Sequence, residues 1–110
     1  MIARRGTLAV VAFAAGAAAC AGAERAPERH EVEIRAFAFA PAALPAYPGD
    51  TLVFVNHDAV PHTATADNGA WDTGSIAANG SKTVVIPANG VAAYHCAIHT
   101  TMVARVDSVK

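Results

Sequence analysis

The stretch PGDTLVFV, residues 48–55, places a turn directly before a strand, and this pairing recurs along the chain. Pro48-Gly49-Asp50 consists of turn-forming residues, whereas Thr51–Val55 is rich in the β-branched and aromatic side chains that favour strands. Glu31–Arg35 alternates polar and apolar residues with the period of two that is typical of a half-buried strand. Further strand candidates are Thr83–Ile86, Val91–Cys96 and Val103–Val109.

Asn-Gly pairs separate several of these candidates: Asn68-Gly69, Asn79-Gly80 and Asn89-Gly90. Asn-Gly tolerates the positive φ angles that tight hairpin turns require. No stretch after residue 30 keeps a helical period for ten residues, and the prolines around Ala40–Leu44 allow one helical turn there at most. Many short strands without helices predict an all-β sandwich or barrel.

The N-terminal segment is typical of a secretory signal peptide. Arg4 and Arg5 precede the apolar run Leu8–Ala19, which is shorter than the roughly 20 residues of a membrane-spanning helix. The segment that begins at Cys20 is small, charged and proline-containing, as expected of a tether. The predicted organisation is a signal peptide (1–19), a tether (20–30) and one domain (31–110).

Two features of this segment stay open. Ala17-Ala18-Ala19 fits ordinary cleavage, and Cys20 fits equally well the lipidated first residue of a bacterial lipoprotein. The Arg4-Arg5 pair is compatible with a twin-arginine exporter, although two basic residues are also ordinary in any signal peptide. We expect export to the bacterial periplasm, with Cys20 as a candidate lipid anchor.

Charge excludes one class of partner. Without Arg4 and Arg5, six basic residues remain against nine acidic ones, which gives a net charge of −3 with neutral histidines. Nucleic-acid binding needs a basic surface, so we do not expect it. The remaining length suffices for one small domain with one core, and we expect a monomer.

Three candidate metal ligands follow one another in YHCAIHTTM, residues 94–102. Cys96, His99 and Met102 offer a thiolate, an imidazole and a thioether at three-residue spacing. Zinc sites do not ordinarily use thioether sulfur, c-type haem needs C-x-x-C-H, and a cysteine-protease site would leave Met102 without a role. Copper accepts all three, and two histidines, a cysteine and a weak axial methionine form an electron-transfer copper site.

Such a site requires a second histidine from elsewhere, and the candidates are His30, His57, His62 and His95. His95 adjoins Cys96 on a predicted strand, so its side chain should point to the opposite face. We expect His30 to be solvated at the end of the tether and His57 to lie on the surface. His62 follows a proline and precedes a strand-like segment, and such a rigid position suits a metal ligand. The predicted ligands are His62, Cys96, His99 and Met102.

With these residues assembled, the sequence resembles the cupredoxins, the small blue copper proteins, and among them the amicyanin-like and plastocyanin-like members. The resemblance runs from about Glu31 to Val106. The matching stretches are Phe37-Ala38-Phe39-Ala40-Pro41, Pro48-Gly49-Asp50-Thr51, Val55-Asn56, Pro61-His62-Thr63, Trp71-Asp72-Thr73-Gly74 and Tyr94 to Met102. It implies a Greek-key β-sandwich of about seven or eight short strands and one type 1 copper ion held by the same four residues.

Two positions depart from the family pattern. The family often has proline after the second histidine ligand, where this chain has Thr100, and asparagine after the first, where it has Thr63. Both positions shape the stiffness or hydrogen bonding around the metal, and therefore bear on its redox potential.

The resemblance implies outer-sphere transfer of single electrons between Cu(I) and Cu(II), not an enzymatic reaction. His99 would be the ligand nearest the surface, and redox partners would dock weakly and transiently near it. Four apolar residues would form a rim around it for docking: Val60, Pro61, Ala97 and Ile98. Packing within the loops accounts for the apolar character of these residues almost as well. A periplasmic copper carrier or scavenger is the main alternative, because it would use the same ligands. A multicopper enzyme would need a second, histidine-rich site, which the scattered remaining histidines do not supply.

Overall fold

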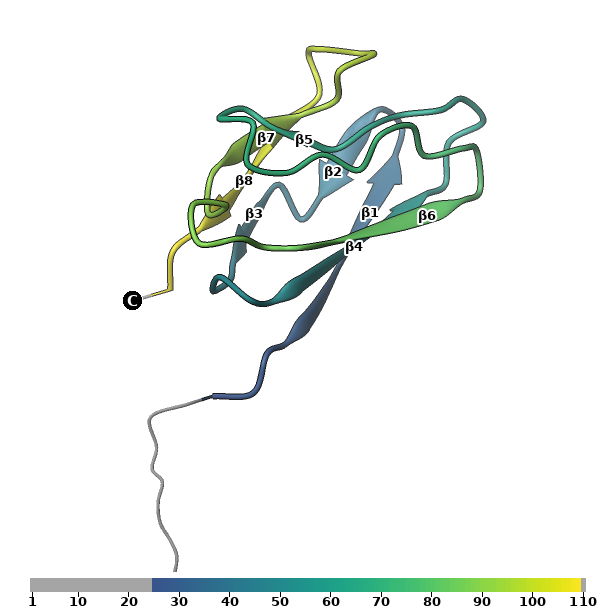
Figure 1. The fold of residues 1–110 in the computed structure, drawn as a ribbon. Coiled ribbons are helices and arrows are strands. Elements are labelled where there is room, and N and C mark those ends of the chain that lie inside the picture. Colours follow the sequence, from purple (N-terminus) through teal and green to yellow (C-terminus); the bar gives the residue numbers. More distant parts are fainter. Residues whose placement is uncertain (1–24, 110) are drawn as a thin grey trace, which may run out of the picture.

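The computed structural model describes residues 25–109; the predicted signal peptide and Cys20 lie outside that range. Eight strands form two four-stranded sheets, and no helix occurs among the described residues (Figure 1). The strands are β1 (Arg29–Arg35), β2 (Ala38–Ala40), β3 (Ala43–Pro45), β4 (Thr51–Asn56), β5 (Thr65–Ala66), β6 (Ser81–Val85), β7 (Ala93–His95) and β8 (Val103–Asp107). The described chain thus contains no helix that could cross a membrane.

The two sheets have the orders β2-β1-β4-β6 and β3-β8-β7-β5, and each contains one parallel pair. β1 runs parallel to β4, and β3 runs parallel to β8, while the other neighbours are antiparallel. Parallel neighbours cannot be joined by a tight hairpin, so the chain must cross between the sheets. The predicted all-β sandwich is confirmed.

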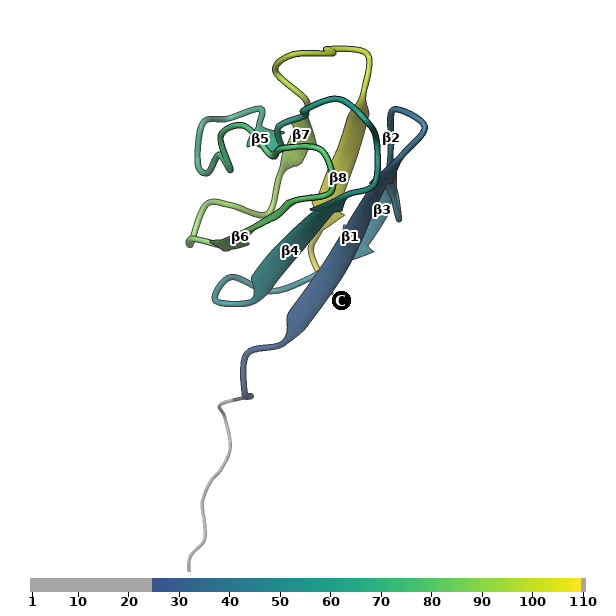
Figure 2. The same ribbon diagram turned by 90° about the vertical axis from the view of Figure 1, so that its right-hand side faces the viewer.

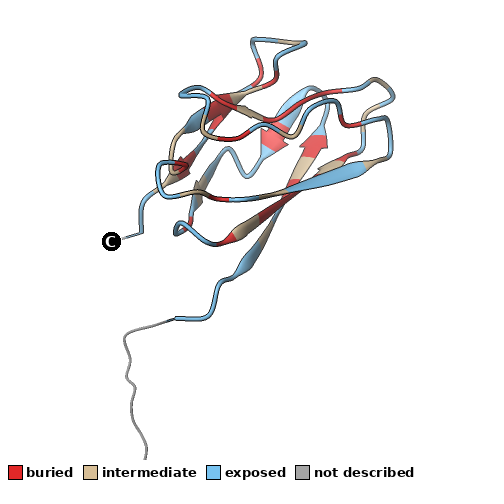
Figure 3. Cartoon of the chain, viewed as in Figure 1, coloured by how far each residue is buried: buried red, intermediate tan, exposed pale blue. Residues whose placement is uncertain are grey.

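The core lies between the two sheets, where buried residues from both line up (Figure 3). In β1, Val32 and Ile34 are fully buried and their neighbours are not, as the alternation of the sequence predicts. Four aromatic rings pack together at the centre of this core, mainly edge to face: Phe39, Phe54, Trp71 and Tyr94. A rigid, closely packed core of this kind holds the loops at its ends in fixed positions.

The turns and strand limits differ from the predictions in two places. The segment between β1 and β4, where one helical turn was the most we expected, instead forms β2 and β3, one in each sheet. The Asn89-Gly90 turn is closed by a Gly90 N–H to Pro87 C=O hydrogen bond, but it leads from β6 in one sheet to β7 in the other. It is therefore a corner between sheets and not a hairpin.

The N-terminal end of the described chain is packed more firmly than a tether. β1 begins at Arg29, inside the predicted tether, and Arg29 and His30 pair with the start of β4. The prediction that His30 is solvated is wrong: its side chain is 15% exposed and its Nε2 lies 2.9 Å from Asp50 Oδ2. Asp50 is twenty residues away in sequence, so local composition could not reveal this contact.

The loop that joins β7 to β8 lies at one end of the sandwich, and the described chain begins at the opposite end (Figures 1 and 2). The predicted ligands belong to that loop and to the segment after β4. The fold therefore gathers them at one end.

Candidate metal centre

Cys96 and His99 lie on the loop between β7 and β8, which closes on itself. The Cys96 N–H donates to the C=O of Met102 at 3.1 Å, and the Met102 N–H donates to the C=O of His99 at 3.0 Å. These two hydrogen bonds fold the loop into a tight turn, so the two side chains three residues apart converge on one side. Cys96 is fully buried and forms no disulfide with any described residue.

His62 lies in the segment between β4 and β5 and is held by its backbone. Its N–H and C=O both bond to Ile76, at 3.1 and 2.7 Å, so a short bridge fixes the residue on both sides. The side chain is fully buried. The prediction that His62 sits on a rigid element agrees with this arrangement.

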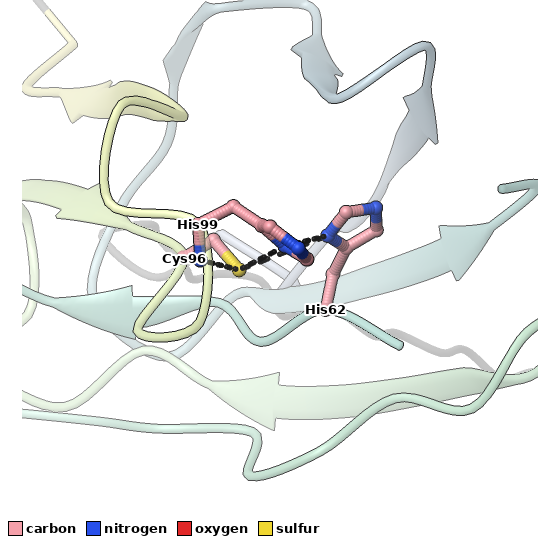
Figure 4. Close-up of side chains that lie close together, drawn as sticks. All are labelled: His62, Cys96 and His99. Atoms are coloured by element: carbon pink, nitrogen blue, oxygen red, sulfur yellow. Dashed lines mark hydrogen bonds between the residues drawn. The ribbon is translucent and has the colours of Figure 1, made fainter. Parts of the chain in front are cut away.

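The three side chains meet in a triangle (Figure 4). Nδ1 of His62 lies 3.1 Å from Nδ1 of His99, and these nitrogens lie 3.8 and 3.9 Å from Sγ of Cys96. A point equidistant from the three atoms lies roughly 2 Å from each, close to the ~2.0–2.3 Å of zinc–nitrogen and zinc–thiolate bonds. These residues could therefore hold a metal ion.

The other nitrogen of His62 fixes which of its ring atoms is free to bind a metal. Nε2 lies 2.8 Å from Oδ2 of Asp58. Burial opposes ionisation of Asp58, but the Phe37 N–H and the His62 ring lower its pKa overall, so it is a carboxylate that only accepts. His62 Nε2 therefore donates to Asp58, which leaves Nδ1 as the ring nitrogen that faces Cys96 and His99.

The sulfur of Cys96 sits among hydrogen-bond donors. The N–H groups of Thr63 and His99 donate to Sγ at 3.3 and 3.4 Å. Burial by itself raises the pKa of this thiol, but these two donors, together with the His62 ring and the Ile98 N–H, outweigh burial and lower the pKa from about 9 to about 6. At neutral pH the group is thus a thiolate, which is the form that binds metal.

Met102, the predicted axial ligand, lies in the same loop and is buried with Cys96 in the core cluster. The structure brings together three of the four predicted residues as a tight group, namely His62, Cys96 and His99. The role of Met102 stays a prediction.

The two remaining histidines lie apart from the centre. His95 bonds to Asp67 on the opposite face from Cys96, as expected from its neighbouring position on the strand. His57 is on the surface, 3.7 Å from Glu33. Neither contributes to the triangle.

Thr63, which departs from the family pattern, links the two ligand segments. Its Oγ1 accepts the Ala97 N–H at 2.8 Å, and the same oxygen lies 2.9 Å from Oγ1 of Thr65. Thr65 in turn donates to Asp72 Oδ1, so its proton is engaged and Thr63 is the donor of the pair. A chain of hydrogen bonds thus runs from the loop after Cys96 to a surface carboxylate.

Sequence reasoning missed Asp58 and did not assign a role to Phe37. Asp58 stands four residues before His62, a spacing that becomes informative only once the loop conformation is known. Phe37 is twenty-five residues from His62, yet its ring lies 5.0 Å from the imidazole. No periodicity or local motif signals such a contact.

The architecture is shared with solved structures of amicyanin. A Cu(I) form of one amicyanin variant aligns with a TM-score of 0.66 at 22% sequence identity, over 78% of this chain and 87% of amicyanin. A reduced Cu(I) form of another variant at pH 4 gives 0.65 and 21% over the same shares, and an oxidised variant gives 0.64 and 20% over 73% and 81%. The chain has the cupredoxin fold. No family model and no curated protein sequence matches it.

Proposed function

We propose that this protein binds one copper ion in a type 1 site and carries single electrons between redox partners. The observation that supports this is the buried triangle of two facing Nδ1 atoms and one thiolate sulfur. A cysteine and two histidines whose ring nitrogens converge in this way match the ligand set of electron-transfer copper sites. Amicyanin, whose fold the chain shares, is known in Cu(I) and oxidised forms.

His62, Cys96 and His99 would be the three strong ligands, with Met102 as the weak axial one. The copper ion, when bound, supplies the Cu(I)/Cu(II) couple. The protein's own contribution is a geometry that changes little between the two states. His62 is fixed by Ile76 and Asp58, and Cys96 by the N–H donors around it. A fixed ligand set lowers the rearrangement that accompanies an electron's arrival or departure.

Electrons would enter and leave near His99, the least buried of the three residues. Three exposed apolar residues adjoin His62 and His99 in the sequence, with Ile98 51% accessible: Pro61, Ala97 and Ile98. Small exposed apolar patches suit weak, transient encounters between redox proteins. We place the protein in the bacterial periplasm, on the strength of the signal-like N-terminal sequence and Cys20 as a candidate anchor.

A single titration tests the proposal. One equivalent of Cu(II) added to the purified protein should produce intense visible thiolate-to-copper absorption, followed by a reversible midpoint potential and fast electron self-exchange. A copper carrier would instead release the ion readily to an acceptor and exchange electrons slowly. Absence of the visible band in the copper-loaded protein would refute the type 1 assignment.

A further inference from the structure

The turn between β1 and β2 holds two consecutive residues in a conformation that their side chains disfavour. Ala36 has φ 51° and Phe37 has φ 61°, both in the left-handed region. Positive φ is uncommon for residues other than glycine, and for a bulky side chain it is a genuine outlier. Such conformations persist only where the surroundings impose them, and they cluster at functional sites.

One carboxylate imposes this conformation. Oδ1 of Asp58 accepts the Ala36 N–H at 2.7 Å, and Oδ2 accepts the Phe37 N–H at 2.9 Å. The same Oδ2 accepts the Nε2 proton of His62 at 2.8 Å. Asp58 is itself held, because its N–H donates to Oδ1 of the buried Asn56. The strained turn and a predicted copper ligand are therefore fixed by a single side chain.

The turn places the Phe37 ring against both histidines. Its centroid lies 5.0 Å from that of His62 and 4.8 Å from that of His99, with interplanar angles of 83° and 81°. The two imidazoles themselves lie 4.9 Å apart, in the pair drawn in Figure 4. Such edge-to-face contacts favour one relative orientation of the rings. Phe37 remains 50% exposed, so burial alone does not explain its position.

We propose that Phe37, held in place by Asp58, is a positioning residue that keeps both imidazoles in the orientation that binds copper and shields that side of the site from water. The proposal rests on the proposed copper site and extends it. A ligand set that is fixed before the metal arrives needs residues that lock its side chains. Two contacts orient the His62 ring: the hydrogen bond to Asp58 and the edge-to-face contact with Phe37. The His99 ring also packs against Phe37, which is its aromatic contact from outside the ligand segments.

The experiment compares the full-length protein with Phe37→Leu, Phe37→Ala, Asp58→Asn and a control. Val85→Ala is the matched control, because Val85 is an apolar residue, 63% exposed, on edge strand β6 and outside the site. In the metal-free protein, NMR should show ring-to-ring contacts from Phe37 to both imidazoles. In Phe37→Ala and Asp58→Asn we expect exchange-broadened histidine ring signals, which indicate loss of a single orientation.

The copper-loaded proteins supply a second readout. Copper extraction by a competing chelator at equilibrium should show an affinity for Cu(II) lower by about 10-fold or more in Phe37→Ala and Asp58→Asn, the range seen when residues behind metal ligands are lost. Phe37→Leu should lie between wild type and Phe37→Ala, since it keeps apolar cover but not the flat ring. The midpoint potential should shift in the same order, which a merely structural role would not require.

The proposal is overturned if Phe37→Ala matches Val85→Ala in histidine ring signals, copper extraction and potential. If Asp58→Asn does not fold, the two Phe37 variants still test the proposal. Phe37 is 50% exposed, so its truncation should not disrupt the hydrophobic core. Failure of the proposed copper function gives a different result: wild type lacks the visible band, while the NMR contacts of the metal-free protein still report whether Phe37 orders the two rings.

Discussion

Thr63 ties the two ligand-bearing segments together through both its backbone and its side chain. Its N–H reaches Sγ of Cys96, and its hydroxyl accepts the N–H of Ala97. Thr63 thus connects the segment of His62 to the loop that carries Cys96. The hydrogen-bond chain that continues through Thr65 to Asp72 orients that hydroxyl, since each link fixes the direction of the next.

Replacing Thr63 by alanine should therefore loosen the site without removing a ligand. The hydroxyl's hydrogen bonds are lost, so we expect the metal-free protein to be less stable by about 1 kcal/mol and the midpoint potential to shift. Thr63→Ser keeps the hydroxyl and serves as the control. Urea unfolding and voltammetry provide the measurements, and equal results for the alanine and serine variants would contradict the linking role.

In the proposed copper site, Cys96 would supply the thiolate that gives the visible absorption. Cys96→Ser replaces the thiolate by a hydroxyl that does not bind copper in the same way, so the intense visible absorption should disappear. The measurement is the visible spectrum after addition of Cu(II). Colour that survives this substitution would mean that another residue supplies the sulfur ligand.

Met102 is expected to be the weakest ligand, so its loss should be tolerated. Met102→Leu preserves the buried apolar volume, and we expect copper to remain bound with its visible band while the midpoint potential changes. Metal analysis and voltammetry on the same sample check both parts. Complete loss of copper would show that the thioether contributes far more than an axial contact.

The site residues that were predicted from the sequence can be recognised from their neighbours in the chain, whereas those that were missed depend on the folded structure. Cys96 and His99 belong to one short loop, so spacing alone identified them, and His62 was marked by the proline before it and the strand-like segment after it. Phe37 contacts Asp58 and both histidines across more than twenty residues, which no local pattern records. Asp58 is only four residues from His62, but their contact depends on the conformation of the loop between them. His30 was misjudged for the same reason.

At the level of elements, the strands show a similar division. β1 and β4 carry clear patterns: β4 ends one residue after the predicted strand, and β1 begins two residues before it. β2 and β3 are three residues each, contain or adjoin prolines, and owe their strand conformation to pairing with β1 and β8. Tertiary pairing overrides weak local preference in such short segments.

The loop between β7 and β8 should give the protein a characteristic pH dependence. The Cys96 thiol has a pKa near 9 when unfolded and about 6 when folded. Because the folded pKa is the lower one, its contribution to the free energy of unfolding is fully present above pH 9 and is lost as pH falls to 6.

The check compares metal-free wild type with Cys96→Ser across that range. The difference in free energy of unfolding between them should shrink as pH falls from 9 to 6, and the ultraviolet absorbance of the thiolate should titrate with a midpoint of about 6. A constant difference across the range would mean that the backbone donors do not stabilise a thiolate. Using the difference removes the contribution of the histidines that lie apart from the sulfur, His30, His57 and His95, which both proteins share.

On the scale of the whole molecule, Asp50 holds the end of the sandwich that is remote from the metal centre. Its buried carboxylate accepts hydrogen bonds from Arg25, His30 and the N–H groups of Glu28 and Tyr47. Burial opposes its ionisation, but these donors outweigh burial and lower its pKa well below the usual range. Arg25 also lies 4.0 Å above the ring of Tyr47.

Asp50→Asn should therefore be strongly destabilising. Asp50 is fully buried but Arg25 is 36% exposed, so the loss comes mainly from the buried donors left without an ionised acceptor and should be about 1–3 kcal/mol. Asp67→Asn, which breaks an exposed pair with His95, is the control and should cost about 1 kcal/mol or less. Urea unfolding measures both. Similar losses in the two variants would show that the Asp50 cluster is no more than a surface ion pair.

The Asp50 cluster fixes Arg25, the first described residue, at the end of the sandwich opposite the loop between β7 and β8 (Figure 1). An anchor attached to the chain before Arg25 would therefore hold the domain at the end remote from the metal centre. His99 and the exposed apolar residues near it would then face away from the anchor, accessible to a redox partner.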